Sequence, residues 1–338
     1  MGTLPLGKIP IETLNETVLK LTGADSDKVV TPAKAGADFA AVRAGDRFIV
    51  VSADPITGIS EDIGTYAIKV SANDVATSGN APQFAESVVL LPEGSSTSDL
   101  ARIARQIHAA AREGGIAILG GHTEVTPGLR RPIVAVTVFS LVDRFVTSGD
   151  ARVGDAIMMT KSAGLEGTAE LAREHVFPDG AVSRGALRRA RRFIDKIDVT
   201  REAVAAFGTG HVHGMHDCTE GGVLGAAFEM SLASGMGFSI DRASVPVAPE
   251  TSEICEALKI DPLRLIASGS LLLAVQRGKE SEVEEAVRPI CDVAKIGEFR
   301  RGGRSVSASG GSTRRLKQAP QDELWRVLGG PGHRRRRF

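Results

Sequence analysis

Two aspartates, Asp54 and Asp74, stand at positions where an ionised side chain is costly. Asp54 comes after the apolar run 48–52, which predicts a short buried strand, and we expect Asp54 just past its carboxyl end, where ligands collect in α/β sheets. Asp74 lies on the core-facing side of a helix predicted over residues 66–78 and stopped by Gly79. A buried carboxylate is unfavourable unless it is paired or binds a metal. Asp74 therefore either pairs with a lysine or arginine or helps to bind a cation.

Three further segments place glycines where backbone amides could face an anion. Asp38 closes the triplet Gly36-Ala37-Asp38 before a predicted strand, although such triplets are most often turns. Residues 119–124, which contain two glycines, follow a strand predicted at 116–119, and a plain tight turn would explain them equally well. Residues 160–168 lead from a strand at 156–160 into a helix predicted at 169–174, whose free amides suit a phosphate. The segment is not a Walker A loop, because the Gly-Lys-Ser order is absent.

A fourth segment, residues 216–223, combines a histidine, an acid and two glycines. Asp217 or Thr219 would cap the helix that we expect to begin there, and capping alone would explain an aspartate at this position. The alternate histidines His211, His213 and His216 invite a zinc interpretation. We do not favour it, because the sequence places them in a glycine-rich turn rather than on one helical face.

The composition is that of an ordinary soluble enzyme. The 338 residues suffice for two domains, each with its own core. Lysine plus arginine and aspartate plus glutamate both number 41, so no global charge argues for nucleic-acid or membrane partners. Three scattered cysteines without a Cys-x-x-Cys pair fit a reducing compartment. No segment approaches about twenty continuous apolar residues, and we expect a cytoplasmic protein.

Strands and helices alternate along the chain, which predicts an α/β or α+β fold in two domains. In the second half they include a strand at 271–275 and a helix at 280–287. We expect domains at residues 1–148 and 149–310, followed by an extension at 311–338 that ends in a basic tail. Residues 99–112 form an amphipathic helix with Ser98 as a plausible N-cap, and the nearly all-apolar strand 133–139 should be covered on both faces. Residues 300–315 should form a flexible loop or a hairpin rim.

Taken in order, five segments resemble the aminoimidazole ribonucleotide synthetase-like superfamily. The segments are Asp38 and residues 52–55, 71–76, 120–128 and 215–222. The resemblance runs from about Lys8 to about Phe299. The superfamily includes thiamine-monophosphate kinase, selenophosphate synthetase and the hydrogenase maturation dehydratase, and residues 248–275 look most like that maturation branch.

The resemblance implies an ATP-dependent enzyme that uses magnesium and forms a homodimer in which the first domains share a β-barrel. By motif position, magnesium would be held by Asp38, Asp54, Asp74 and Asp217, of which Asp54 and Asp217 would also be catalytic. The nucleotide would be bound by Lys8, Asn73, Gly120, Gly121, Thr123, Glu124, Gly164 and Gly167. Oxygen ligands are those that magnesium prefers, and a metal that neutralises phosphoryl charge fits such a site.

The reaction implied is phosphorylation of an amide or carbonyl oxygen on a small or carrier-bound acceptor. The chain departs from the maturation branch, because its last cysteine is Cys291 and it ends in Arg-Arg-Arg-Arg-Phe, so we expect no self-modification of the tail. Ala37, Cys218 and Glu220 replace other residue types of the related motifs, which could alter magnesium affinity or acceptor choice. A kinase resembling thiamine-monophosphate kinase and a non-catalytic nucleotide-binding scaffold are the alternatives.

Overall fold

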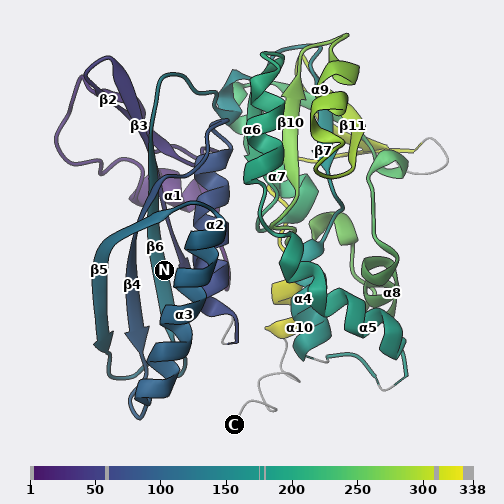
Figure 1. The fold of residues 1–338 in the computed structure, drawn as a ribbon. Helices are drawn as coiled ribbons and strands as arrows, with labels where there is room; N and C mark the ends of the chain where they lie inside the picture. The colour runs from purple at the N-terminus through teal and green to yellow at the C-terminus, as the bar shows by residue number, and fades with distance from the viewer. Residues whose placement is uncertain (1–3, 58–60, 175, 179, 308–311, 330–338) are drawn as a thin grey trace.

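Two β-sheets with their helices divide the chain into two halves that lie side by side (Figure 1). The structure is a computed structural model that describes residues 4–57, 61–174, 176–178, 180–307 and 312–329. The α/β architecture in two domains confirms the predicted fold class. The boundary at 148–149 stays a prediction.

The first sheet has six strands in the order β1-β2-β3-β6-β4-β5, with β4 and β5 parallel and the other described pairs antiparallel. The strands are β1 (Val29–Thr31), β2 (Ala40–Ala44), β3 (Arg47–Ile56), β4 (Phe84–Leu91), β5 (Ala117–Val125) and β6 (Ile133–Val142). Helix α1 (Ile11–Thr17) precedes the sheet, and α2 (Ile63–Ala76) and α3 (Thr97–Glu113) cover its face toward the second half (Figure 1).

The strand around Val50 is longer than predicted. Strand β3 continues to Ile56, so Asp54 lies inside the strand opposite Val136 of β6, and the expectation that it follows the strand end is wrong. Pairing with the long strand β6 extends β3 past Pro55. The sequence had predicted that strand β6 is covered on both faces. Buried and half-buried residues alternate along it, so within one chain only one of its faces is fully covered and the prediction is wrong.

Strand β5 corrects the prediction for the double-glycine segment. Gly120 and Gly121 lie within this edge strand rather than in a turn after it. Gly121 has φ +145°, and a Cβ atom there would overlap the Ser87 carbonyl oxygen of β4, so the glycine permits close strand pairing. Every residue of β5 is exposed.

Helix α2 lies between the two halves of the molecule and is buried along nearly its whole length. It packs on β3 and β6 on one side and contacts α6 (Thr200–Gly208) and β8 (Val212–Asp217) on the other. This position confirms the predicted burial of Asp74. In helix α3 the N-cap is Ser96 and not Ser98, because Ser96 and Asp99 form a reciprocal capping box.

The second sheet has seven strands in the order β13-β12-β9-β11-β7-β10-β8. Its other strands are β7 (Ala156–Thr160), β9 (Gly237–Asp241), β10 (Leu271–Val275), β11 (Val293–Arg300), β12 (Arg304–Ser307) and β13 (Thr313–Arg315). The remaining helices are α4 (Leu165–Glu174), α5 (Arg184–Ala190), α7 (Gly222–Ser234), α8 (Pro249–Leu258), α9 (Glu280–Val287) and α10 (Glu323–Leu328). Alternate residues of β7 point to two cores, one under α7 and one under α6.

Strands β7 and β10 and helix α9 have the predicted bounds, whereas strand β8 was predicted as a turn. His213 and His216 lie on that strand, so the glycine-rich turn assigned to them is wrong. Pairing with β10 holds this polar segment in extended form. Helix α6 and strand β11 were not predicted either. Within the range 300–315, which was expected to form a flexible loop or a hairpin rim, β12 pairs with β13 in antiparallel fashion.

The predicted basic tail, residues 333–338, lies outside the described residues. The described part of the extension contains α10, which packs its Leu324 against the second half near α5 and α8 (Figure 1). Among the described residues no helix has the length and apolar character needed to span a membrane.

Candidate functional site

Three side chains from two segments, one in each half of the molecule, meet where the halves face each other. Asp38 comes from the loop before β2, and His216 and Asp217 come from the end of β8. His216 Nε2 lies 3.1 Å from Asp38 Oδ1, and the possible metal-binding atoms of the three residues lie within 4.8 Å of one another. The fold therefore brings together two of the four aspartates predicted to hold magnesium.

The other two aspartates lie beside this group. Asp74, on α2, accepts a 2.6 Å hydrogen bond from Ser52 Oγ of β3 and also shares a hydrogen bond with Asp54. Among the described residues no lysine or arginine forms an ion pair with Asp74, so the ion-pair alternative is not realised. Asp74 interacts electrostatically with Asp217 and Asp38. The four aspartates thus form one cluster of interacting carboxyl groups.

Burial and mutual repulsion dominate the electrostatics of this cluster. Burial raises the pKa of Asp38 to about 6, against the opposing effect of His216. Burial and the charges of Asp54 and Asp217 raise the pKa of Asp74 well above its ordinary value, and burial and Asp38 do the same for Asp217. Asp38 Oδ2 and Asp217 Oδ2 are buried without a hydrogen-bond partner. A cation placed among these oxygens would relieve both the repulsion and the missing contacts.

Lys8 and Glu229 border the cluster. Lys8 Nζ lies 3.2 Å from Glu229 Oε1 and 3.4 Å from Thr219 Oγ1. Although burial opposes its charge, Glu229 raises the pKa of Lys8. Burial likewise opposes ionisation of Glu229, but Lys8 and His216 lower the pKa of Glu229 to about 2. Lys8 therefore stands as a cation beside the carboxylates, and its contact with phosphates stays a prediction.

Asn73 is occupied elsewhere. Its Nδ2 donates to the Ile197 carbonyl oxygen at 2.7 Å, and Val199 N donates to its Oδ1 at 3.0 Å. The side chain is fully buried. Both polar ends of Asn73 thus tie α2 to the second half, which supplies a structural reason for the residue beside its predicted role with nucleotide.

Unlike the buried aspartates, the double-glycine segment lies on the exposed strand β5. Glu124 accepts from Thr126 Oγ1 at 2.7 Å and lies 3.1 Å from His122 Nε2, and both Thr123 and Glu124 are exposed on β5. Their roles with nucleotide, together with those of Gly120 and Gly121, stay predictions.

The loop before α4 differs from what its sequence indicates. Helix α4 begins at Leu165 rather than at Ala169. The Gly167 amide donates to the Ile266 carbonyl oxygen at 2.9 Å, and a Cβ atom at Gly167 would overlap Leu265, so this amide is not free as predicted. Gly164, with φ +69°, ends the loop in a left-handed conformation. Phosphate binding by Gly164 and the neighbouring amides stays a prediction.

Glu166, on the same helix, is a buried acid whose Oε2 has no hydrogen-bond partner. Burial raises its pKa to about 8, against a hydrogen bond with Ser268.

The unfolded chain loses the Glu166 proton above about pH 4.5 whereas the folded protein keeps it to about pH 8, so ionisation destabilises the fold increasingly between these values. We expect Glu166→Gln to raise the free energy of unfolding by about 1–3 kcal/mol at pH 7. Urea unfolding across this range measures it, and an equal gain at pH 4 and pH 8 would contradict it.

Sequence reasoning missed His216 and Glu229 as members of the site. His216 was set aside because β8 was predicted as a turn, and Glu229 gave no local signal within the apolar helix α7. Burial alone would lower the pKa of His216. The negative charges of Asp38 and Glu229 outweigh this effect and raise the pKa to about 9. Asp217 ends β8, and the N-cap of α7 is Gly221, so the predicted capping by Asp217 or Thr219 is wrong.

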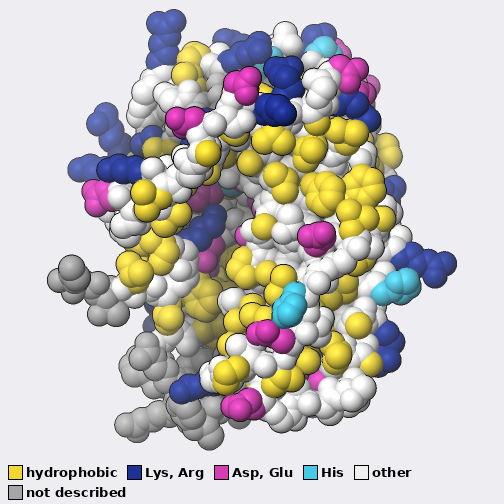
Figure 2. Space-filling model, turned by 90° about the vertical axis from the view of Figure 1, so that its left-hand side faces the viewer, with side chains coloured by type: hydrophobic (Ala, Val, Ile, Leu, Met, Phe, Trp, Pro, Cys, Tyr) yellow, Lys and Arg dark blue, Asp and Glu magenta, His cyan; other side chains and the backbone are white. Residues whose placement is uncertain are grey.

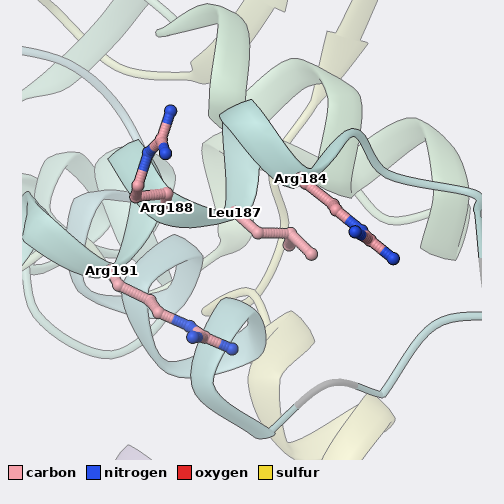
Figure 3. A pocket seen from close by; sticks show the side chains of 4 residues that line it. All are labelled: Arg184, Leu187, Arg188 and Arg191. Atoms are coloured by element: carbon pink, nitrogen blue, oxygen red, sulfur yellow. The ribbon is translucent and has the colours of Figure 1, made fainter.

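Two surface cavities have linings that include none of the four aspartates. The cavity in Figure 3, of about 330 Å³, is lined by Arg184, Leu187, Arg188 and Arg191 of the α5 region. The side chains of Arg184 and Arg188 point apart in this view, so they do not converge on one small ligand. By contrast, Figure 2 shows a hollow with acidic, basic and histidine side chains within it.

The fold defines a two-domain α/β protein with a cluster of four interacting aspartates between its halves. Two family descriptions match the chain: AIR synthase related protein, N-terminal domain, over residues 36–142, and its C-terminal domain over residues 152–308. The chain therefore belongs to the AIR synthase related family, and within it stands close to the hydrogenase maturation protein HypE.

Relatives and solved structures support this placement. A hydrogenase expression/formation protein of Methanocaldococcus jannaschii is 28% identical and covers 83% of this chain and 84% of its own. The carbamoyl dehydratase HypE of Bradyrhizobium diazoefficiens is 31% identical, and the match covers 70% of this chain and 68% of the relative. A crystal structure of HypE in complex with ATP has a TM-score of 0.71 at 22% identity, with 93% of each chain covered. The structure of thiamine monophosphate kinase from Aquifex aeolicus has a TM-score of 0.68 at 19% identity, and the match covers 87% of this chain and 96% of the kinase.

Proposed function

We propose that the protein is a magnesium-dependent ATP-using enzyme that phosphorylates an amide or carbonyl oxygen of a small or carrier-bound acceptor. The observation that carries the proposal is the cluster of Asp38, Asp54, Asp74 and Asp217 with two buried, unpartnered carboxylate oxygens. The family relationship to carbamoyl dehydratases, and a related structure that contains ATP, support nucleotide as the phosphoryl donor.

The residues of the chain have distinct tasks in this proposal. The four aspartates would hold magnesium, which neutralises charge on a triphosphate when it is bound. Lys8 would donate to phosphate oxygens at the edge of the cluster, because its Nζ lies beside Thr219 and Glu229. His216, placed 3.1 Å from both Asp38 and Glu229, orients these two acids.

Two other functions remain as alternatives. The thiamine monophosphate kinase fold similarity favours a small-molecule kinase with the same metal site and a different acceptor. The departures Cys218 and Glu220, next to Asp217, would fit a scaffold that binds nucleotide without catalysis. Measurable ATP turnover would distinguish either of the two enzymes from the non-catalytic scaffold.

Asp54→Asn tests the assignment. Asp54 is half-exposed on β3 and hydrogen-bonds Asp74, so the change removes a charge with little effect on packing. We expect magnesium-dependent ATP hydrolysis to fall by about 10²-fold, as for removal of one charged group at a transition state. A phosphate-release assay over a panel of amide and carbonyl acceptors measures it, and unchanged hydrolysis would remove Asp54 from the metal site.

We also propose that the protein is a homodimer that pairs through its first sheet. Val88, Ile118, Leu119 and Val125 of β4 and β5 are between 37% and 56% exposed. Figure 2 shows hydrophobic side chains gathered on this side of the molecule. An exposed edge strand with apolar side chains is a ready surface for another chain. A partner there would also cover the half-buried face of β6.

Leu119→Glu combined with Val125→Glu should convert this dimer to a monomer, because both charges would be buried in the interface. Sedimentation velocity measures the mass against that of the 35.5 kDa chain. Val153→Glu, at an exposed apolar residue outside the first sheet, is the matched control and should stay dimeric. A dimer that survives the double change would place the interface elsewhere.

A further inference from the structure

The carboxyl-terminal extension reaches the amino-terminal arm beside the carboxylate cluster. Residues 320–328 are attached to the second half of the molecule. Arg264 Nη2 donates to the Gln321 carbonyl oxygen at 3.0 Å, and Arg326 Nη2 donates to that of Lys259 at 2.9 Å. Leu324 is buried in a core formed with residues of α4, α5 and α8. The segment thus has a fixed position from which it can act on its neighbours.

Asp322 joins this segment to the loop that follows Asp217. It is 6% exposed, and its Oδ2 accepts a 2.6 Å hydrogen bond from Gly221 N while Oδ1 accepts from Leu324 N at 2.7 Å. One carboxylate therefore caps α10 and holds the backbone at Gly221. That backbone has φ +88° and directly follows Glu220.

Glu220 and Trp325 in turn enclose the amino-terminal arm. Glu220 Oε1 accepts a 2.7 Å hydrogen bond from Lys8 N. Gly7, with φ +89°, lies so close that a Cβ atom would overlap both Glu220 Oε1 and Trp325 Nε1. The indole thus forms one wall of a narrow passage through which the arm runs before Lys8 Nζ reaches Glu229 and Thr219.

We propose that Trp325 and Asp322 are positioning residues that hold the arm so that Lys8 stands at the carboxylate cluster. The extension is then part of the nucleotide site rather than an appendage. This inference rests on the proposed function for its catalytic meaning, but the positioning itself rests on the contacts of Gly7, Lys8 and Glu220 alone. Without the indole wall the arm loses one of its two neighbours and samples positions away from the cluster.

A double-mutant cycle between Lys8→Ala and Trp325→Ala tests the proposal, with binding of magnesium and a non-hydrolysable ATP analogue measured by calorimetry. Each single change should weaken binding by about 10-fold, and the double variant should bind like Lys8→Ala alone, because the indole acts through Lys8. Trp325→Phe should restore most of the loss. Additive effects would show that Trp325 does not act through Lys8 and would overturn the proposal.

Hydrogen exchange gives a second readout that needs no nucleotide. The Lys8 amide, which donates to Glu220, should exchange at least 10-fold faster in Trp325→Ala and in Asp322→Asn than in the wild type. Lys317→Ala, an exposed change in the same extension, should leave both readouts as in the wild type. Unchanged exchange of Lys8 in both variants overturns the positioning. Absence of nucleotide binding in the wild type, with faster exchange in the variants, overturns the proposed function alone.

Discussion

Asp217→Asn is expected to unfold at a higher temperature than the wild type without divalent cations, and yet to lose magnesium-dependent ATP turnover by about 10²–10³-fold. The two effects have one cause. Asp217 is 1% exposed, burial and Asp38 oppose its ionisation, and its Oδ2 has no partner. An amide of the same shape removes the repulsion and with it a charge that the cation requires.

Thermal unfolding with and without magnesium, together with phosphate release, measures both effects on one preparation. Asp46→Asn, at an exposed turn aspartate, is the matched control and should change neither property. A variant of Asp217 that is less stable than the wild type and fully active would show that Asp217 is a structural residue and not a metal ligand.

Asn73→Ala is expected to lower the free energy of unfolding by about 2–5 kcal/mol, because it leaves two buried backbone groups without partners. These groups are the Ile197 carbonyl oxygen and the Val199 amide, both bonded to the Asn73 side chain. Loss of these two hydrogen bonds also weakens the attachment of α2 to the second half. The distance between Asp74 and Asp217 is then less well fixed.

Chemical denaturation measures the change, with Asn15→Ala on the exposed side of α1 as the control. A shift no larger than that of the control would mean that α2 is held by its apolar contacts alone. Unaltered nucleotide affinity in the folded Asn73→Ala protein would remove Asn73 from the predicted nucleotide contacts.

The fold class could be predicted from the sequence because apolar strands and amphipathic helices alternate clearly. Strand β10 and helix α9 have the predicted bounds, since their periodicity is local. Strand β8 could not be predicted, because its Val-His-Gly-Met-His-Asp sequence is extended by pairing with β10 and not by propensity. The same holds for β3, where pairing with β6 carries the strand through Asp54.

The candidate site divides in the same way. Asp38, Asp54, Asp74 and Asp217 could be singled out because motif order links them to a family. His216 and Glu229 could not, because their importance arises from contacts between β8, α7 and the loop before β2, which are distant in the chain. The part of the extension around Trp325 was not singled out from the sequence, since its contact with Gly7 joins opposite ends of the chain.

Calorimetric titration of the wild-type protein with a non-hydrolysable ATP analogue, in magnesium and again in excess chelator, tests whether the four aspartates hold a metal for nucleotide. We expect binding in magnesium that weakens by at least about 100-fold when the cation is removed, because the four carboxylates repel a bare triphosphate. Binding of equal strength in chelator would contradict it, since the aspartate cluster would then have no metal to hold.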